Sequence, residues 1–143
     1  IPIVEVGTDR HRLDMWTAAA RDRYASYETD YDWGFRYFQK TDGYVATEMT
    51  GLWLRGPYLH NGSVPSLRAL LEPPALRPAT FWRGHDLVDA TAGGFVSDRE
   101  TVGGRRGWHY DTTLPGNGNG GHLWGTALSP EAKDALLAYL KTL

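Results

Sequence analysis

Residues 51–74 read GLWLRGPYLHNGSVPSLRALLEPP and place a restricted loop directly before a short helix. Pro57 and Pro65 flank the loop, and each proline fixes a backbone torsion, so we expect the loop to aim the ring of His60. Ser66 is a favourable N-cap for a helix over SLRALLE. The two prolines that follow cannot continue the helix and end it. The stretch therefore predicts a rigid histidine-bearing loop attached to a short helix.

Length and composition fit a single domain over residues 1–143. Hydrophobic residues make up 41% of the chain and aromatic residues 13%, which indicates either a core built from rings or a large flat ligand. The 15 basic and 17 acidic residues give a net charge of -2 and no basic stripe, which argues against a nucleic-acid partner. No apolar run is long enough to cross a membrane. The absence of cysteine excludes disulfides and thiolate metal sites.

The N-terminal part of the sequence predicts one helix and then an irregular segment. The opening IPIVEV is short and apolar and turns at Gly7, after which Thr8 or Asp9 can cap a helix over residues 10–24. The buried face of this helix is expected from residues at helical spacing, namely Leu13, Trp16, Ala20 and Tyr24. Residues 27–49 predict an aromatic loop with one short helical turn.

The C-terminal part predicts long loops followed by a well-marked helix. Residues 73–121 hold most of the glycine, which favours long loops and a short two-stranded ribbon near FVSD and GWHYD. Ser129, Pro130 and Glu131 supply a cap, a first-turn proline and an early acidic residue for the last helix. Its expected buried stripe is Leu136, Leu137, Leu140 and Leu143, and its expected exposed residues are Lys133, Asp134 and Lys141.

The five histidines are the residues best suited to carry chemistry. His11 lies on the polar side of the first predicted helix and is expected at the surface. His85 and His109 each sit beside an aspartate and are expected to be structural. His122 follows GNGNGG, where glycine lets the backbone approach a ligand closely. The residues alone leave His122 open as a ligand or as an ordinary loop residue, and GNGNGG lacks the Lys-Ser/Thr of a phosphate-binding loop.

Beyond these local signals, the PYLHNGSVPSL block resembles the haem domains of the di-haem cytochrome c peroxidase superfamily. The similarity continues through VGTD, RPATFWRGHDLVD and PGNGNGGHLWGTALSPEAKDALLAYLKTL, and is closest to the rubber-oxygenase-like branch. The resemblance implies a mainly α, cytochrome c-like haem domain with long Gly/Pro-rich loops and little β structure. It also implies an exported protein that is periplasmic or secreted.

The family attaches haem c covalently through a C-x-x-C-H segment, which this sequence lacks. The resemblance begins after that segment, and the chain opens without the basic and apolar parts of a signal peptide. We therefore expect a C-terminal portion, processed or truncated, whose partner is a haem-bearing upstream portion or a separate cytochrome chain.

The resemblance also assigns individual residues around the haem. His122 matches the distal histidine that ligates the iron in the rubber-oxygenase-like branch. The methionine that ligates iron in simple peroxidases is absent, because Met15 and Met49 both precede the PYLHNGSVPSL block. His60 matches a histidine beside the haem, where it would bond a propionate or orient the loop. The other expected cofactor-binding residues are Trp53, Tyr58, Trp108 and Trp124.

The family often holds a calcium ion through backbone carbonyls just before the PYxH histidine. Arg55 and Pro57 occupy those positions, so a calcium site is an expectation of the resemblance. Arg55 stands where threonine is usual, and its guanidinium disfavours a divalent cation nearby.

The function implied is that of an electron-transfer haem in an oxidoreductase of peroxidase or oxygenase type. Two histidine ligands would leave no open iron position, so this chain alone is not expected to be catalytic, and no catalytic residue is assigned. Two alternatives stay open: a non-catalytic accessory subunit of an electron-transfer complex, and a haem-free binding module that retains the fold.

Overall fold

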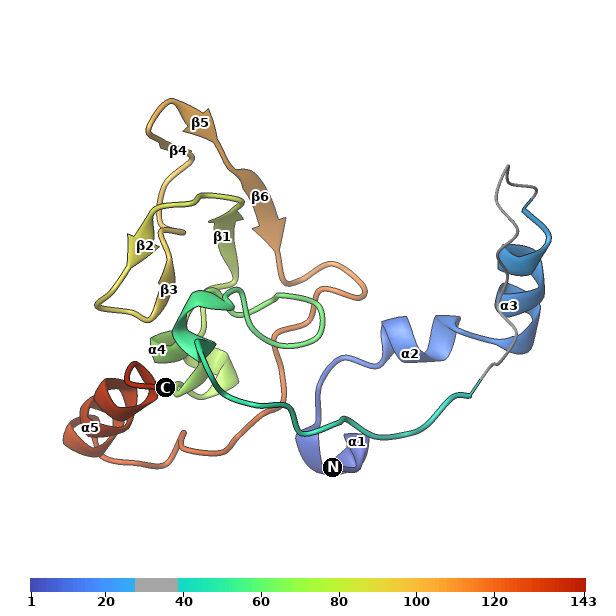
Figure 1. Ribbon diagram of the computed structural model, residues 1–143, viewed down its shortest axis with the longest axis horizontal. Helices are drawn as coiled ribbons and strands as arrows, with labels where there is room; N and C mark the ends of the chain where they lie inside the picture. Colours follow the sequence, from blue (N-terminus) through green and yellow to red (C-terminus); the bar gives the residue numbers. More distant parts are fainter. Residues whose placement is uncertain (28–38) are drawn as a thin grey trace.

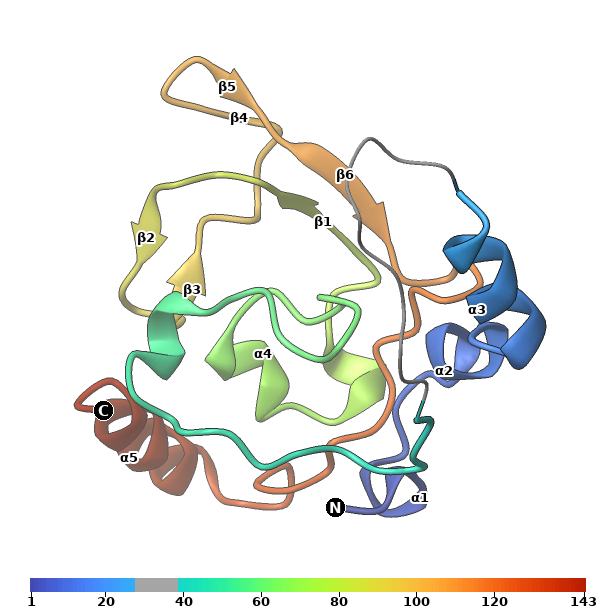
Figure 2. The same cartoon turned by 45° about the vertical axis from the view of Figure 1, so that its right-hand side comes forward.

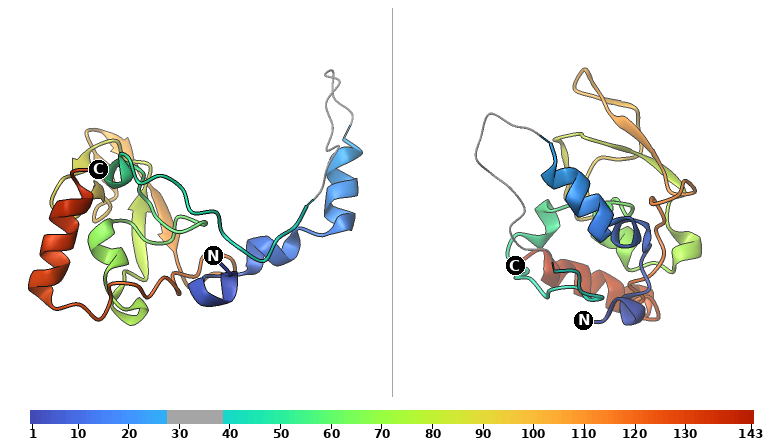
Figure 3. Two further views of the ribbon diagram at one scale, coloured as in Figure 1. Left: turned by 60° about the horizontal axis from the view of Figure 1, so that its bottom comes forward. Right: turned by 90° about the vertical axis from the view of Figure 1, so that its right-hand side faces the viewer.

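The computed structural model describes residues 1–27 and 39–143. Three helices, α1 (Ile3–Val6), α2 (His11–Met15) and α3 (Ala18–Ala25), form an N-terminal arm. In this arm α2 and α3 extend away from the rest of the molecule, as Figures 1 and 3 show, whereas Ile3 and Val6 of α1 are buried. None of the helices in the described segments has the length and apolar character required to cross a membrane.

The body of the protein is built around two short helices and a loop. α4 (Leu67–Leu70) and the C-terminal α5 (Pro130–Leu140) pack together, while two 3-10 turns, η1 (Leu52–Leu54) and η2 (Pro74–Leu76), lie on either side of α4 in sequence. The core cluster consists of Tyr58, Val64, Leu67, Ala69 and Leu137. Burying the side chain of Leu67 or Leu137, each 2% exposed, contributes about 2–3 kcal/mol.

Three small antiparallel sheets lie above these helices (Figure 2). β1 (Thr80–Arg83) pairs with β6 (Trp108–Asp111), and β2 (Val88–Asp89) pairs with β3 (Gly94–Phe95). The third pair, β4 (Thr101–Val102) and β5 (Arg105–Arg106), is a hairpin with a Gly-Gly turn.

The expectation of a mainly α fold with little β structure is wrong. Helices account for only 29% of the described residues and strands for 16%. Two-stranded ribbons do form at FVSD and at GWHYD, but the two segments pair with other strands, FVSD through β3 with β2 and GWHYD through β6 with β1. Strand partners were misassigned because Phe81, Trp82 and Tyr110 lie in a region whose many glycines indicated loops.

The predicted helix over residues 10–24 is divided at Trp16, whose ψ of 89° leaves the helical region. Thr17 then caps α3 by accepting a hydrogen bond from the N–H of Ala20. Neither α2 nor α3 has a buried residue, so the predicted apolar face does not pack into the core. Residues 39–49 form no helix or named strand, as expected of a loop, and the rest of the predicted 27–49 loop lies mostly outside the described residues.

The predicted starts of the two later helices are confirmed. The hydroxyls of Ser66 and Ser129 accept hydrogen bonds from the N–H groups of Ala69 and Ala132. Leu137 is buried as predicted, but Lys133, expected on the exposed side of α5, is only 8% exposed. Its ammonium group donates to the Glu72 carboxylate at 2.9 Å, which explains how a lysine can be buried there.

Candidate functional site

His122 ends a glycine-rich loop over residues 116–122 and adopts a left-handed backbone with a φ of 50°. Residues other than glycine enter this region rarely, and usually where the surrounding structure holds them. The N–H of His122 donates to the carbonyl oxygen of Val6 at 2.6 Å. The loop that carries His122 is therefore tied to α1, near the opposite end of the sequence.

Asn61 joins this loop to the loop that carries His60. Its side-chain nitrogen donates to the carbonyl oxygens of Gly116 and Gly118 at 3.1 and 2.9 Å. Its side-chain oxygen accepts from the N–H of Ser63 at 3.2 Å. The PYLHNG and GNGNGGH segments, which are far apart in the sequence, are thus parts of one site.

Arg77 holds the same loop from the other side. Its guanidinium donates to the carbonyl oxygens of Asn119, Gly121 and His122 at 2.6, 2.9 and 3.0 Å. It also donates to backbone oxygens of the α4 segment, at Glu72 and Leu70. Arg77 is 5% exposed, so this arginine is an internal part of the fold.

Two glycines of the loop lie close to the N-terminal segment, and at Gly121 the contact is with backbone and leaves no room for a side chain. A Cβ at Gly121, where φ is +80°, would stand 2.5 Å from backbone atoms of Val6, Gly7 and Thr8. A Cβ at Gly118 would stand 2.9 Å from the carboxylate of Asp9. The glycine content of GNGNGG therefore serves close packing against the chain start.

The His122 ring is half-buried and faces Trp124 edge-on at a centroid distance of 5.1 Å. Its Nδ1 atom is buried and finds no hydrogen-bond partner among the residues that the structure describes. Burial lowers the pKa of His122 below its usual value, and the nearby charge of Arg77 acts in the same direction. Both effects favour the neutral imidazole, which is the form that binds a metal ion.

His60 is linked to the start of the chain through Tyr44. The Nδ1 atom of His60 lies 3.2 Å from the Tyr44 hydroxyl, which lies 2.8 Å from the hydroxyl of Thr8. Burial lowers the pKa of His60 as well. Thr8 directly follows the backbone against which Gly121 packs, so His60 and His122 are both anchored on one short segment, residues 6–8.

A cavity of about 520 Å³ opens beside His60. Its wall includes Leu13, Met15, Trp16 and Tyr44. Met15, which precedes the PYLHNGSVPSL block in sequence, therefore shares this cavity with His60 in space. The wall is mainly apolar, with Asp9 and Arg12 among its charged residues.

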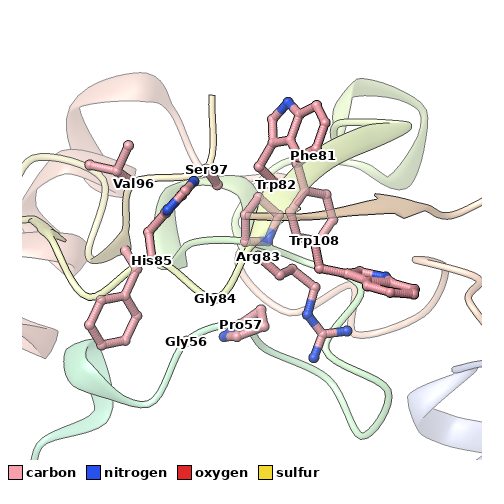
Figure 4. A pocket seen from close by; sticks show the side chains of 12 residues that line it. Gly56, Pro57, Phe81, Trp82, Arg83, Gly84, His85, Val96, Ser97 and Trp108 are labelled. Carbon is pink, nitrogen blue, oxygen red and sulfur yellow. The ribbon is translucent and has the colours of Figure 1, made fainter. Parts of the chain in front are cut away.

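The four aromatic residues expected at the cofactor are not gathered around His122. Trp124 is the one that contacts the His122 ring, and it is 49% exposed. Trp53 packs on the core cluster, and Tyr58 is buried there with its hydroxyl near the carbonyl oxygens of Leu52 and Gly93. Trp108 is 74% exposed and lines a second cavity, which has neither His60 nor His122 in its wall (Figure 4).

The expected calcium position lies between η1 and the His60 loop. The Arg55 side chain is exposed and donates to the carbonyl oxygen of Glu48 at 2.9 Å. Pro57 is half-buried and lines the second cavity. Within residues 1–27 and 39–143, no three His, Asp or Glu side chains gather as a metal site.

The other three histidines have separate environments. His11 is exposed, as predicted, and lies against Gly116 of the glycine-rich loop. His85 is buried, and its Nε2 atom lies 2.9 Å from the carbonyl oxygen of Arg99 rather than bonding to a carboxylate. His109 is exposed, and its ring lies tilted against that of Trp82 at a centroid distance of 4.8 Å.

Sequence reasoning missed the residues that build the site around His122. Arg77 stands in PALRP with no local pattern to mark it, and Asn61 was assigned no role from the sequence. Thr8 was considered as a helix cap, whereas its hydroxyl bonds Tyr44. The one available signal was the density of glycine, which indicated close backbone approach but not the partner.

Comparison with known proteins bears directly on this arrangement. Residues 43–83 match the RoxA-like, cytochrome c-like family. The matched stretch contains the His60 loop, Asn61 and Arg77, and it supports a cytochrome c-like domain of the RoxA-like branch. A cytochrome c-like family implies binding of haem c.

Two relatives from Sinorhizobium fredii extend the similarity beyond the matched stretch. An uncharacterized protein, y4iJ, is 45% identical over 109 residues, which is 70% of this chain and 18% of the relative. A second uncharacterized protein, y4iM, is 36% identical over 118 residues, which is 70% of this chain and 27% of the relative. The chain thus spans about a fifth to a quarter of the length of these relatives.

The residues of the site fit haem c in two respects, and the missing cysteine is a departure. His122 offers a neutral imidazole with an unpartnered buried nitrogen. Leu123 and Trp124 are 60% and 49% exposed and offer apolar surface to a flat ring. The sequence has no cysteine, so the covalent bonds to haem c would have to come from another segment or chain.

Proposed function

We propose that this chain supplies the distal axial ligand and part of the pocket of an electron-transfer haem in a di-haem c-type oxidoreductase. The observation that carries the proposal is His122, a half-buried histidine on a loop fixed from three directions, by Val6, Asn61 and Arg77. The match of residues 43–83 to a cytochrome c-like family supports the cofactor.

In this proposal each residue of the site has a limited task. When bound between two histidines, haem c supplies reversible one-electron transfer at iron. His122 would offer an imidazole nitrogen to the iron, and the loop that carries it is held by the contacts to Val6, Asn61 and Arg77. Trp124 and Leu123 would offer apolar surface to the haem. His60, fixed by Tyr44, is available to bond a propionate or to hold its own loop.

The rest of the proposed assembly lies beyond this chain. A C-x-x-C-H segment, upstream or on a companion cytochrome chain, would bind the haem covalently, and a second haem would carry out the oxidative step on peroxide or oxygen. Because c-type haem is attached outside the cytoplasm in this family, we place the protein in the periplasm or outside the cell. A calcium ion at the carbonyls of Arg55 and Pro57 completes the proposal.

The test is the visible absorption spectrum of the complete haem-bearing protein, oxidised and then reduced with dithionite. His122→Ala is expected to remove low-spin bands from one haem, whereas His109→Ala, an exposed histidine away from the loop, should leave the spectrum unchanged. An unchanged spectrum in His122→Ala would refute the ligand assignment. Intact-mass analysis of the same preparation would show which polypeptide carries the haem.

A further inference from the structure

Arg77 is a buried cation surrounded by backbone carbonyl groups. Its exposed fraction is 5%, and its guanidinium donates to five carbonyl oxygens at 2.6–3.3 Å, those of Leu70, Glu72, Asn119, Gly121 and His122. Three of the five belong to the loop that ends at His122. The other two belong to the end of α4 and the residues after it, which lie against the core.

The charge of Arg77 is not neutralised by a carboxylate. In the parts of the chain that the structure describes, no Asp or Glu oxygen lies within ion-pair distance of Arg77. Glu72 is the nearest acidic residue in sequence, yet it offers Arg77 its backbone oxygen only. Its carboxylate is bound to Lys133 at 2.9 Å.

We propose that Arg77 is the positioning residue for His122 and that its uncompensated charge raises the reduction potential of the haem that His122 would ligate. The inference rests on the proposed function. It adds a task for a residue that contacts the backbone of His122 and not its ring.

The positioning part follows from geometry. The left-handed backbone of His122 and the close approach of Gly121 to residues 6–8 both need the loop to stay in one conformation. The planar fork of arginine reaches Asn119, Gly121 and His122 together, which a lysine ammonium cannot match in geometry. Replacing Arg77 would leave these carbonyl oxygens without their donor. The loop could then move, and the hydrogen bond from the His122 N–H to Val6 could break.

The electrostatic part follows from the sign of the charge. Reduction removes one unit of positive charge from the iron, so a nearby buried cation favours the reduced state. A guanidinium stays protonated in a protein interior, so this effect persists across the whole working pH range. Because Arg77 is buried, dissolved salt screens its charge only weakly.

The experiment compares Arg77→Met and Arg77→Lys in the complete haem-bearing protein, with Arg68→Met as control. Arg68 pairs with Asp134 on the surface of α4 and α5, so its loss removes a charge without touching the loop. In Arg77→Met, the ratio of reduced to oxidised haem at a fixed ambient potential should fall about tenfold, a shift of ~59 mV for one electron. Arg77→Lys keeps the positive charge, so the reduction potential of the haem should fall much less in this variant than in Arg77→Met.

A second measurement covers the case in which Arg77→Met does not fold. In Arg77→Lys without haem, amide hydrogen exchange at His122 should be at least about tenfold faster than in the wild type, while exchange within α5 stays unchanged. The inference is overturned if both Arg77 variants match Arg68→Met in potential, or if exchange at His122 is unchanged in Arg77→Lys.

These results are separable from those that test the proposed function. If His122→Ala changes the haem spectrum but the Arg77 variants alter neither potential nor exchange, His122 is the ligand and the inference about Arg77 is wrong. If His122→Ala leaves the spectrum unchanged, the ligand assignment itself fails, whatever the Arg77 variants do.

Discussion

The backbone N–H of His122 donates a 2.6 Å hydrogen bond to the carbonyl oxygen of Val6, which makes the first helix a support for the candidate ligand. The contact is possible because Gly121, one residue earlier, has no Cβ. It therefore links the glycine pattern of the sequence to the geometry of the site, and it can be tested by substitution.

Gly121→Ala should destabilise the protein by about 2–4 kcal/mol, because its Cβ would meet backbone atoms at 2.5 Å and its φ of +80° disfavours an L side chain. Urea unfolding measures the change. Gly120→Ala is the matched control, since its Cβ would approach no described atom closer than the Gly7 oxygen at 4.0 Å. The control should stay within about 1 kcal/mol of the wild type. Equal effects would contradict the close packing at Gly121.

Asn61→Ala should cost about 1–3 kcal/mol of stability, because it leaves the carbonyl oxygens of Gly116 and Gly118 without their donor. It should also speed amide exchange in the glycine-rich loop. Asn119→Ala, which loses a solvent-exposed bond to Pro78, is the control and should change stability by about 0.5 kcal/mol or less. Similar losses in both variants would mean that Asn61 does not join the two loops.

Lys133→Ala should destabilise the protein by about 1–3 kcal/mol, since it leaves the Glu72 carboxylate without its partner. The double variant Lys133→Ala with Glu72→Gln should lose less than the sum of the single variants Lys133→Ala and Glu72→Gln, because it removes both charges together. Chemical unfolding of the four proteins gives the coupling energy. Arg99→Ala, from a surface ion pair with Asp98, should show no measurable change. If the losses of unfolding free energy in the two single variants add up to the loss in the double variant, Lys133 and Glu72 do not stabilise each other as a buried pair.

Acid should destabilise the protein partly through His60. Burial lowers the folded-state pKa of His60, so below about pH 6.5 the unfolded chain takes up a proton before the folded chain does. Stability is therefore complete above that pH and falls as the pH decreases toward the folded-state pKa. His60→Asn should reduce the loss of unfolding free energy between about pH 7 and pH 5. An unaltered pH dependence of the unfolding free energy in His60→Asn would contradict the shift.

Local sequence signals predicted the parts of the fold that local residues determine. Ser66 and Ser129 cap their helices through N–H groups three positions ahead, so the pattern and the contact lie in the same few residues. The first helix was predicted too long because helical spacing alone cannot reveal that the core has no surface for Trp16 to cover. Nothing in the spacing marks the break before Thr17.

The candidate site depends on contacts that no local pattern encodes. His122 was picked out by its glycine-rich context and by resemblance, and the structure brings it to the His60 loop through Asn61. Arg77 reaches His122 across 45 positions of sequence, and a single arginine between prolines gives no sign of such a partner. Strand pairing failed for the same reason, since Phe81 and Tyr110 find each other only in the folded chain.

The bond between Val6 and His122 also sets an order of assembly. At a synthesis rate of about 5–20 residues per second, the segment around Val6 leaves the ribosome roughly ten seconds before His122 does. During that interval Ile3 and Val6, both buried in the finished protein, have no glycine-rich loop to cover them. The first helix must therefore wait for the last third of the chain, and premature termination anywhere before His122 would leave an apolar N-terminal segment exposed to proteases and chaperones.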